Sequence, residues 1–248
     1  MEKASGRHRL ATDFFTTPSW KKTSLGTSIA LFASAPLEQL ENQRPVLLMG
    51  GIHGDEPEGV RLAEETLAWL KTRPRSSVVP WIVIPCLNMD GYAKRTRVNG
   101  RGVDLNRNYP SVDWSPKAEK ERYFPGTAPA SEPEIQGVVE LIKRFDPRLL
   151  IHCHSWKPMI VGTGERSKPD SLRLGKSSGY EVVDEIGYPT PGSLSRYGWH
   201  DLKIPVICIE EQDQLTDLSG IWPRFQTGMK EIFEDFGSRR DSSVGGLR

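Results

Sequence analysis

Apolar residues fall in several short runs along the chain, and each run ends in a polar turn that holds glycine or charged residues. The runs occupy residues 45–51, 78–88, 147–155, 159–164 and 204–212. Their length and their content of Val, Ile and Leu predict central β-strands that are covered on both faces.

Between and after these runs, apolar residues recur at helical spacing in three segments, which are residues 58–73, 132–145 and 219–236. Strands that alternate with amphipathic helices predict a single α/β domain around a mostly parallel or mixed sheet. We assign residues 1–238 to this domain and expect residues 239–248, which are polar and rich in Gly and Ser, to form a flexible tail.

Two long segments, residues 91–130 and 162–200, show no clear periodicity. Loops of this length in a compact domain usually surround a functional site. We therefore expect both segments to lie near the chemistry of the protein.

The composition limits the kind of protein. The chain has 248 residues, enough for one large domain with a buried core, and a formal net charge of +1. Near-neutral charge gives no electrostatic support for a nucleic-acid or anionic-membrane partner. No stretch approaches the roughly 18 apolar residues that span a bilayer, and residues 1–15 lack the apolar segment of a secretory signal. Three cysteines without paired spacing indicate a reducing compartment, so we expect a cytoplasmic protein.

The segment GGIHGDEPEG follows directly on the first apolar run. A helix start explains part of it, because Asp55 can cap a helix with Glu58 three residues on, and Pro57 suits the first turn. That interpretation leaves His53 and Glu56 unexplained. Ligands of α/β proteins gather beyond the carboxyl ends of strands, so this histidine and carboxylate can equally be half of a metal site.

Two more histidines, His152 and His154, lie at the end of the run LLIHCHS. A lone histidine there is more often a hydrogen-bonded structural residue. With His53 and Glu56, however, the two strand ends resemble a His₂Glu zinc site that keeps one position open for water. Residues two apart on a strand face the same side, so the spacing does not choose between His152 and His154 as the third ligand.

Two further segments carry candidate chemistry. The loop RVNGRGVDLNRNYP is rich in Arg and Asn. A solvated basic loop is the ordinary interpretation, but a guanidinium group also offers a planar fork that suits a carboxylate or a developing oxyanion. The run ICIEE places Glu210 directly behind apolar residues, where an unpaired carboxylate is costly to bury. This favours a functional role or a buried partner for Glu210.

In their order along the chain, these motifs resemble those of the zinc metallocarboxypeptidase (funnelin) family. The matching motifs are HGDE, NMDG, RVN, GVDLNRN, SEPE, HCHS, YPTPGS and ICIEE. GVDLNRN, SEPE and YPTPGS are similar to the bacterial murein tripeptide amidase branch, whose members cleave the γ-D-glutamyl–meso-diaminopimelate bond of recycled cell-wall peptides. The resemblance implies a three-layer α/β/α sandwich around a mixed central sheet of roughly eight strands.

The resemblance also implies the catalytic residues. It places one Zn²⁺ ion on His53, Glu56 and His152. It makes Glu210 the general base and Arg97 the group that polarises the scissile carbonyl. The implied activity is a zinc-dependent hydrolysis that releases the C-terminal residue of a peptide.

The substrate-binding residues follow from the same motifs. The resemblance implies that Asn106, Arg107 and Tyr188 hold the terminal carboxylate of the substrate. His154 is expected to face the substrate or to support the metal ligands. Arg196, just after YPTPGS, is expected to line the pocket for the terminal side chain. This segment is polar and basic, so we predict a polar or acidic terminal residue such as diaminopimelate.

One departure from the family pattern leaves the substrate open. The murein amidases carry an acid soon after the second zinc histidine, whereas this chain reads CHSW. A cytosolic carboxypeptidase that acts on ordinary or glutamate-rich peptides is therefore an alternative, followed by an aspartoacylase-type deacylase and a non-catalytic zinc-binding module. The partner that we expect is a peptide or muropeptide with a free C-terminal carboxylate, with no nucleic acid and no membrane. The oligomeric state does not follow from the sequence.

Overall fold

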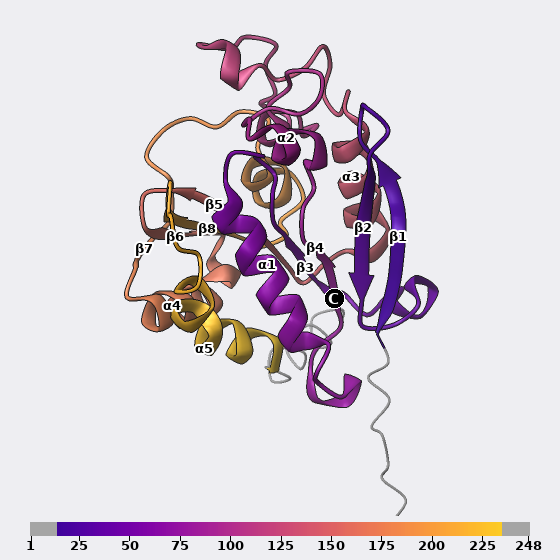
Figure 1. The fold of residues 1–248 in the computed structure, drawn as a ribbon, viewed down its shortest axis with the longest axis vertical. Coiled ribbons are helices and arrows are strands. Elements are labelled where there is room, and N and C mark those ends of the chain that lie inside the picture. The colour runs from indigo at the N-terminus through magenta and orange to yellow at the C-terminus, as the bar shows by residue number, and fades with distance from the viewer. Residues whose placement is uncertain (1–13, 235–248) are drawn as a thin grey trace, which may run out of the picture.

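The protein is described by a computed structural model that covers residues 14–234 (Figure 1). Eight strands form one sheet in the order β1-β2-β4-β3-β5-β8-β6-β7. Their bounds are β1 Phe15–Lys22, β2 Ser28–Ala33, β3 Val46–Met49, β4 Trp81–Ile84, β5 Leu149–Trp156, β6 Met159–Thr163, β7 Glu181–Val183 and β8 Val206–Gln212. The central strands β4, β3, β5 and β8 are parallel to one another, whereas β2 pairs antiparallel with β4 and β6 antiparallel with β8. The predicted mixed sheet is confirmed.

Helices cover both faces of the sheet (Figure 1). They are α1 Pro57–Leu70, α2 Met89–Lys94, α3 Pro133–Phe145, α4 Lys168–Ser178 and α5 Ile221–Glu234. Side chains alternate across a strand, so Val46 and Leu48 of β3 pack with residues of α1 and α5, while Leu47 and Met49 pack with residues of α3. This alternation builds two buried cores and the predicted three-layer α/β/α sandwich.

Two parts of the fold were not anticipated from the pattern. The β1–β2 hairpin forms one end of the sheet. No side chain of β1 is fully buried, and the strand therefore does not need the apolar run that marks a central strand. Helix α4 lies within the segment expected to be irregular. Its amphipathicity is weak, because Leu174 is buried but Leu172 is exposed to solvent.

The other segment without periodicity, residues 91–130, is mostly irregular, with short 3₁₀ turns at Leu105–Arg107 and Glu121–Tyr123. In Figure 1 it extends from α2 over the upper end of the molecule.

Cys86, Cys153 and Cys208 are all buried free thiols. No helix within residues 14–234 is long and apolar enough to cross a bilayer. The predicted tail at residues 239–248 lies outside the described residues.

Candidate metal centre and active site

The candidate site lies at the carboxyl ends of β3, β5 and β8. In the parallel register, Met49 at the end of β3 pairs with His152 of β5, and His152 pairs with Cys208 of β8. One step further along, His154 pairs with Glu210. Strand ends therefore bring the chemically active side chains of distant segments to one edge of the sheet, as expected for an open α/β protein.

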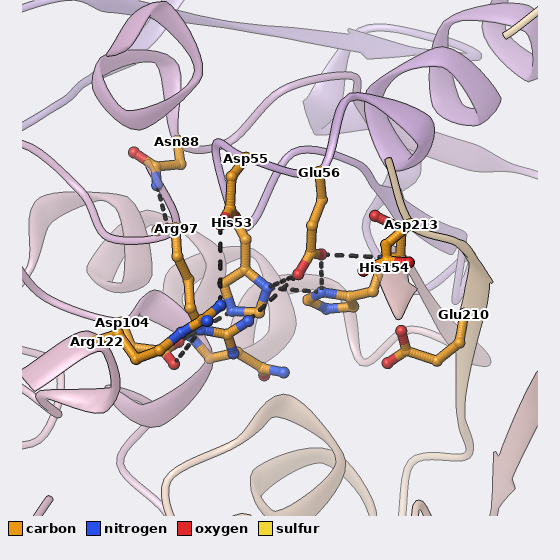
Figure 2. Close-up of polar contacts among 12 residues, drawn as sticks. His53, Asp55, Glu56, Asn88, Arg97, Asp104, Arg122, His154, Glu210 and Asp213 are labelled. Atoms are coloured by element: carbon orange, nitrogen blue, oxygen red, sulfur yellow. Dashed lines mark hydrogen bonds and ion pairs between the residues drawn. The ribbon is translucent and has the colours of Figure 1, made fainter. Parts of the chain in front are cut away.

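Three buried side chains converge at this edge (Figure 2). Nδ1 of His53 is 2.8 Å from Oε1 of Glu56, and Nδ1 of His154 is 2.8 Å from Oε2 of the same carboxylate. The Nδ1 atoms of the two histidines are 3.0 Å apart. We call His53, Glu56 and His154 the donor group, because their ligand atoms lie within 4.8 Å of one another.

The start of α1 places Glu56 in this group. Glu56 is the N-cap residue of α1, and its side chain makes no capping hydrogen bond, so the carboxylate is free to turn toward the histidines. Gly59 allows α1 to approach β5 closely, since a Cβ atom at this position would lie 2.3 Å from the carbonyl oxygen of Cys153.

The predicted capping box at this helix is wrong. Asp55 is not the N-cap, and its carboxylate lies 3.9 Å from Nη2 of Arg122. Glu58 instead accepts hydrogen bonds from the hydroxyl of Ser155, at 2.8 Å, and from the backbone N–H of Leu215, at 2.9 Å. Glu58 thus joins the loop after β8 to the end of β5. Only Pro57, at the first turn, has the predicted role.

The structure groups a different histidine with His53 and Glu56 from the one that the sequence analysis expected. His152 lies outside the donor group, and His154 takes the place that the sequence analysis gave to His152. The reason is register. His152 is level with the last residue of β3, whereas His53 and Glu56 lie in the turn beyond that residue, level with His154. The Nδ1 of His152 is 2.8 Å from Nε2 of His154, so His152 contacts the donor group through His154.

Asp104 is a functional residue that the sequence analysis missed. Its buried carboxylate bonds Nε2 of His53 at 3.0 Å and accepts from Nε of Arg97 at 3.0 Å. Burial raises the pKa of Asp104, but the charges of His53 and Arg97 outweigh it and hold the pKa well below its ordinary value. Its place inside the motif GVDLNRN, followed by apolar Leu105, was the available signal.

Arg97 is fixed at the edge of the donor group. Its Nη1 donates to Oε1 of Glu56 at 3.3 Å, in addition to the bond from Nε to Asp104. The guanidinium also lies 5.3 Å from the ring centroid of Tyr123, a ring that Arg107 and Arg122 contact as well. The structure thus places Arg97 beside the donor group.

Glu210 projects from β8 into the same cleft, and Figure 2 shows its carboxylate on the donor-group side of the strand. Burial and the negative charge of Glu56 raise the pKa of Glu210 to about 8. The thiol of Cys208 donates to Oε1 of Glu210 at 3.3 Å. Its neighbour Glu211 points the other way, because alternate strand residues face opposite sides, and it pairs with Tyr180 and Arg224.

The expected substrate-binding residues line one cleft with a volume of about 1510 Å³. The Oδ1 of Asn106 accepts from the backbone N–H of Leu194 at 3.0 Å, which leaves its NH₂ group for a ligand. Arg107 is nearly buried, and its Nη1 donates to the carbonyl of Asn106 at 2.7 Å. Tyr188 is 46% exposed and lies edge-on against Trp156, with the ring centroids 5.6 Å apart.

Arg196 lines the same cleft, but its charge is already paired. Its Nε donates to Oδ2 of Asp113 at 2.6 Å, and its Nη1 is 3.2 Å from Nε2 of His200. The structure therefore places Arg196 in the cleft lining, with its guanidinium bonded to Asp113, another residue of that lining.

The fold and this arrangement define a metallopeptidase. The chain matches the zinc carboxypeptidase family over residues 13–204 and belongs to that family. It is therefore a zinc-dependent peptide hydrolase.

Individual relatives make the similarity more specific. The chain is 30% identical over 192 residues to murein peptide amidase A of Escherichia coli strain K12, with 73% of this chain and 75% of that protein covered. It is 27% identical over 221 residues to murein peptide amidase A of Vibrio campbellii, with 83% and 84% covered. The fold is similar to the crystal structure of the murein-tripeptide amidase MpaA from Escherichia coli O157, with a TM-score of 0.70, 26% identity and 89% and 92% of the two chains covered.

The donor group fits the zinc ion that the family implies. Two imidazole nitrogens and one carboxylate form a His₂Glu set, the type found in catalytic zinc sites. In each histidine the second ring nitrogen already has a partner, Asp104 for His53 and His152 for His154. Partners of this kind fix the tautomer and the orientation of metal-binding histidines, so the ring nitrogens that converge are free to bind a cation.

Proposed function

We propose that this protein is a zinc-dependent amidase that releases the C-terminal residue of a murein peptide by cleaving the γ-D-glutamyl–meso-diaminopimelate bond. The observation that carries the proposal is the convergence of the donor group, Glu210 and the arginine-lined cleft at one sheet edge. The names of the relatives in Escherichia coli and Vibrio campbellii support the murein substrate.

We assign the metal to His53, Glu56 and His154. Zinc in such a site lowers the pKa of a water molecule and polarises a carbonyl group. Glu210 lies on the neighbouring strand, where its carboxylate would accept the proton of the attacking water and then pass it to the leaving amine. The raised pKa of Glu210 suits both roles, because a group that both takes and gives a proton works best near the operating pH.

The arginines of the cleft would bind the negative charges of the reaction. Arg97 is fixed by Asp104 and Glu56, and its guanidinium would stabilise the oxyanion of the scissile carbonyl. Arg107 and the free amide of Asn106 would hold the terminal carboxylate, with Tyr188 closing over it from the mouth of the cleft. Binding of the free carboxylate by these residues would limit cleavage to the last bond of the peptide.

A substrate pool with and without chelator tests the proposal. The purified protein is incubated with ordinary peptides, glutamate-rich peptides, N-acyl amino acids and murein tripeptides, and the products are identified by mass spectrometry. We expect diaminopimelate to be released fastest and release to stop when a chelator removes zinc. Faster release of C-terminal Phe, Leu or Glu would replace the murein substrate by an ordinary peptide. Deacylation of N-acyl amino acids alone would overturn the peptidase assignment for this chain.

A further inference from the structure

His152 is a buried imidazole whose role the reaction does not explain. Its side chain is 1% exposed, and its Nε2 atom has no hydrogen-bond partner among residues 14–234. A buried polar atom that lacks a partner costs about 1–3 kcal/mol. Such a cost in a native structure calls for an explanation, and a ligand that arrives from the cleft is one, because His152 is part of the cleft wall.

The hydrogen-bond network determines which atom of His152 carries the proton. Nδ1 of His154 belongs to the donor group, so in the metal-binding form the proton of His154 is on Nε2. That N–H donates to Nδ1 of His152, 2.8 Å away. His152 accepts at Nδ1 and is therefore neutral, with its own proton on Nε2. The unpartnered atom is a hydrogen-bond donor.

The sheet register places His152 on the floor of the cleft. His154 of β5 pairs with Glu210 of β8, and this pair forms the catalytic level. One level deeper, His152 pairs with Cys208, and Cys208 pairs with Val161 of β6. All three of these deeper residues line the cleft. The thiol of Cys208 is engaged with Glu210, so the N–H of His152 is the polar group that this floor offers to a ligand.

We propose that His152 determines specificity for the terminal residue of the substrate, by donating its Nε2–H to a carboxylate on that residue's side chain. This inference rests on the proposed function, which puts the scissile bond beside the donor group and Glu210. It adds that the terminal side chain enters the deeper part of the cleft, which His152, Cys208 and Val161 line. The Nε2–H of His152 is a hydrogen-bond donor, so the substrate group that it binds must be an acceptor. A carboxylate is favoured among acceptors because a hydrogen bond to an ionised acceptor is shorter and stronger than one to a neutral acceptor. Diaminopimelate carries such a carboxylate at the far end of its side chain.

Two peptides that differ in this one group provide the test. L-Ala-γ-D-Glu-meso-diaminopimelate and L-Ala-γ-D-Glu-L-Lys share every group except the distal carboxylate. We expect the wild-type enzyme to favour the diaminopimelate peptide in kcat/KM. His152→Asn keeps an acceptor near the Nδ1 position but has no donor at the Nε2 position, so the preference should fall by about 10-fold or more. His152→Gln places an amide N–H near Nε2 and should keep a larger part of the preference.

The control is an asparagine substitution outside the cleft, at Leu172 of α4, whose side chain is exposed to solvent. Leu172→Asn should leave the ratio within about twofold, as expected for a surface substitution. Zinc affinity, measured by competition with a chelator, should fall more in His152→Gln than in His152→Asn, because only the asparagine keeps an acceptor for His154. A merely structural role for His152 would change zinc affinity and stability but would leave the ratio between the two peptides unchanged.

A measurement on the wild-type protein avoids any folding defect of the variants. In ¹⁵N-imidazole NMR spectra of the zinc-loaded protein, free diaminopimelate should shift the Nε2–H resonance of His152, and lysine should not. An unchanged resonance, or an unchanged kcat/KM ratio in His152→Asn, overturns the inference. If the wild-type enzyme releases the terminal residue of neither peptide, the proposed function fails, which is a different result.

Discussion

At the residue scale, the site contains pairs of neighbouring side chains that have different roles. Glu210 and Glu211 are adjacent on β8, and both are buried. Glu210 faces the cleft, whereas Glu211 bonds Tyr180 and Arg224 on the other side of the sheet. His154 and His152 also have different roles. His154 belongs to the donor group, whereas His152 lies behind it and contacts His154.

The two glutamates therefore give a matched pair of variants. Glu210→Gln should lower kcat by about 10²–10⁴-fold, because the amide accepts no proton from water, while zinc affinity remains. Glu211→Gln should keep kcat within a few-fold but lower the free energy of unfolding by about 1–3 kcal/mol, because Arg224 and Tyr180 lose their charged partner. Kinetics, chelator competition and urea denaturation measure these effects. Full activity in Glu210→Gln would refute the base assignment.

Asp104 permits a test of how far the partner of a metal-binding histidine matters. Asp104→Asn keeps the shape of the side chain but removes the charge that bonds both His53 and Arg97. Loss of such partners typically lowers metal affinity by about 10–100-fold, and chelator competition measures this. Asp113→Asn is the control, because that carboxylate bonds Arg196 instead of a donor-group histidine. Equal zinc affinity in Asp104→Asn and the wild type would contradict the role of Asp104.

The pKa of Glu210 predicts in which direction the rate of the reaction changes with pH. Glu210 must be ionised to accept a proton, so kcat/KM should fall as the pH drops below its pKa, which the protein raises to about 8. A bound cation favours the carboxylate and moves this acid limb to lower pH. The thiol of Cys208 also lowers the pKa of Glu210 by donating to it. Cys208→Ala should therefore move the acid limb of the pH profile to higher pH, and a move to lower pH would disprove the coupling.

At the element scale, close packing of α1 on β5 sets the position of Glu56. Gly59 lies in the first turn of α1, where a Cβ atom would collide with the backbone of Cys153. Gly59→Ala should push the helix away from the strand and cost about 1–3 kcal/mol of unfolding free energy, with a loss of zinc affinity. Gly220→Ala is the matched control, because the nearest atom to its added Cβ is 4.0 Å away. Denaturation curves compare the two variants, and equal stability would show that α1 has room to move.

The elements also show what the sequence could and could not predict. Buried runs such as VLLM in β3 and the periodic helix α3 were evident, because their patterns come from one strand or helix alone. The strand ends predicted a metal site with His53 and Glu56. The choice between His152 and His154 depends on how β5 is aligned with β3, which is a property of two segments about 100 residues apart. The edge strand β1 was missed because edge strands bury little.

At the scale of the whole molecule, the donor group joins segments that are far apart in sequence, so zinc binding should stabilise the entire fold. A ligand that binds only the folded state, at 1,000 times its Kd, contributes about 4 kcal/mol. For a protein of this size, that corresponds to a rise in Tm of roughly 8–16 °C. Differential scanning calorimetry with added zinc and with a chelator measures the difference, and an unchanged Tm would contradict a metal site that spans β3, α1 and β5.

Variants then distinguish the two histidines of β5 by the same measurement. His154→Asn removes a donor-group nitrogen, so the zinc-dependent rise in Tm should largely disappear. His152→Asn keeps the three donors and an acceptor for His154, so most of the rise should remain. Because each variant is compared with itself without zinc, any general loss of stability cancels. A larger loss of the zinc-dependent rise in His152→Asn would restore His152 as the third ligand and reject the register that places His154 opposite Glu210.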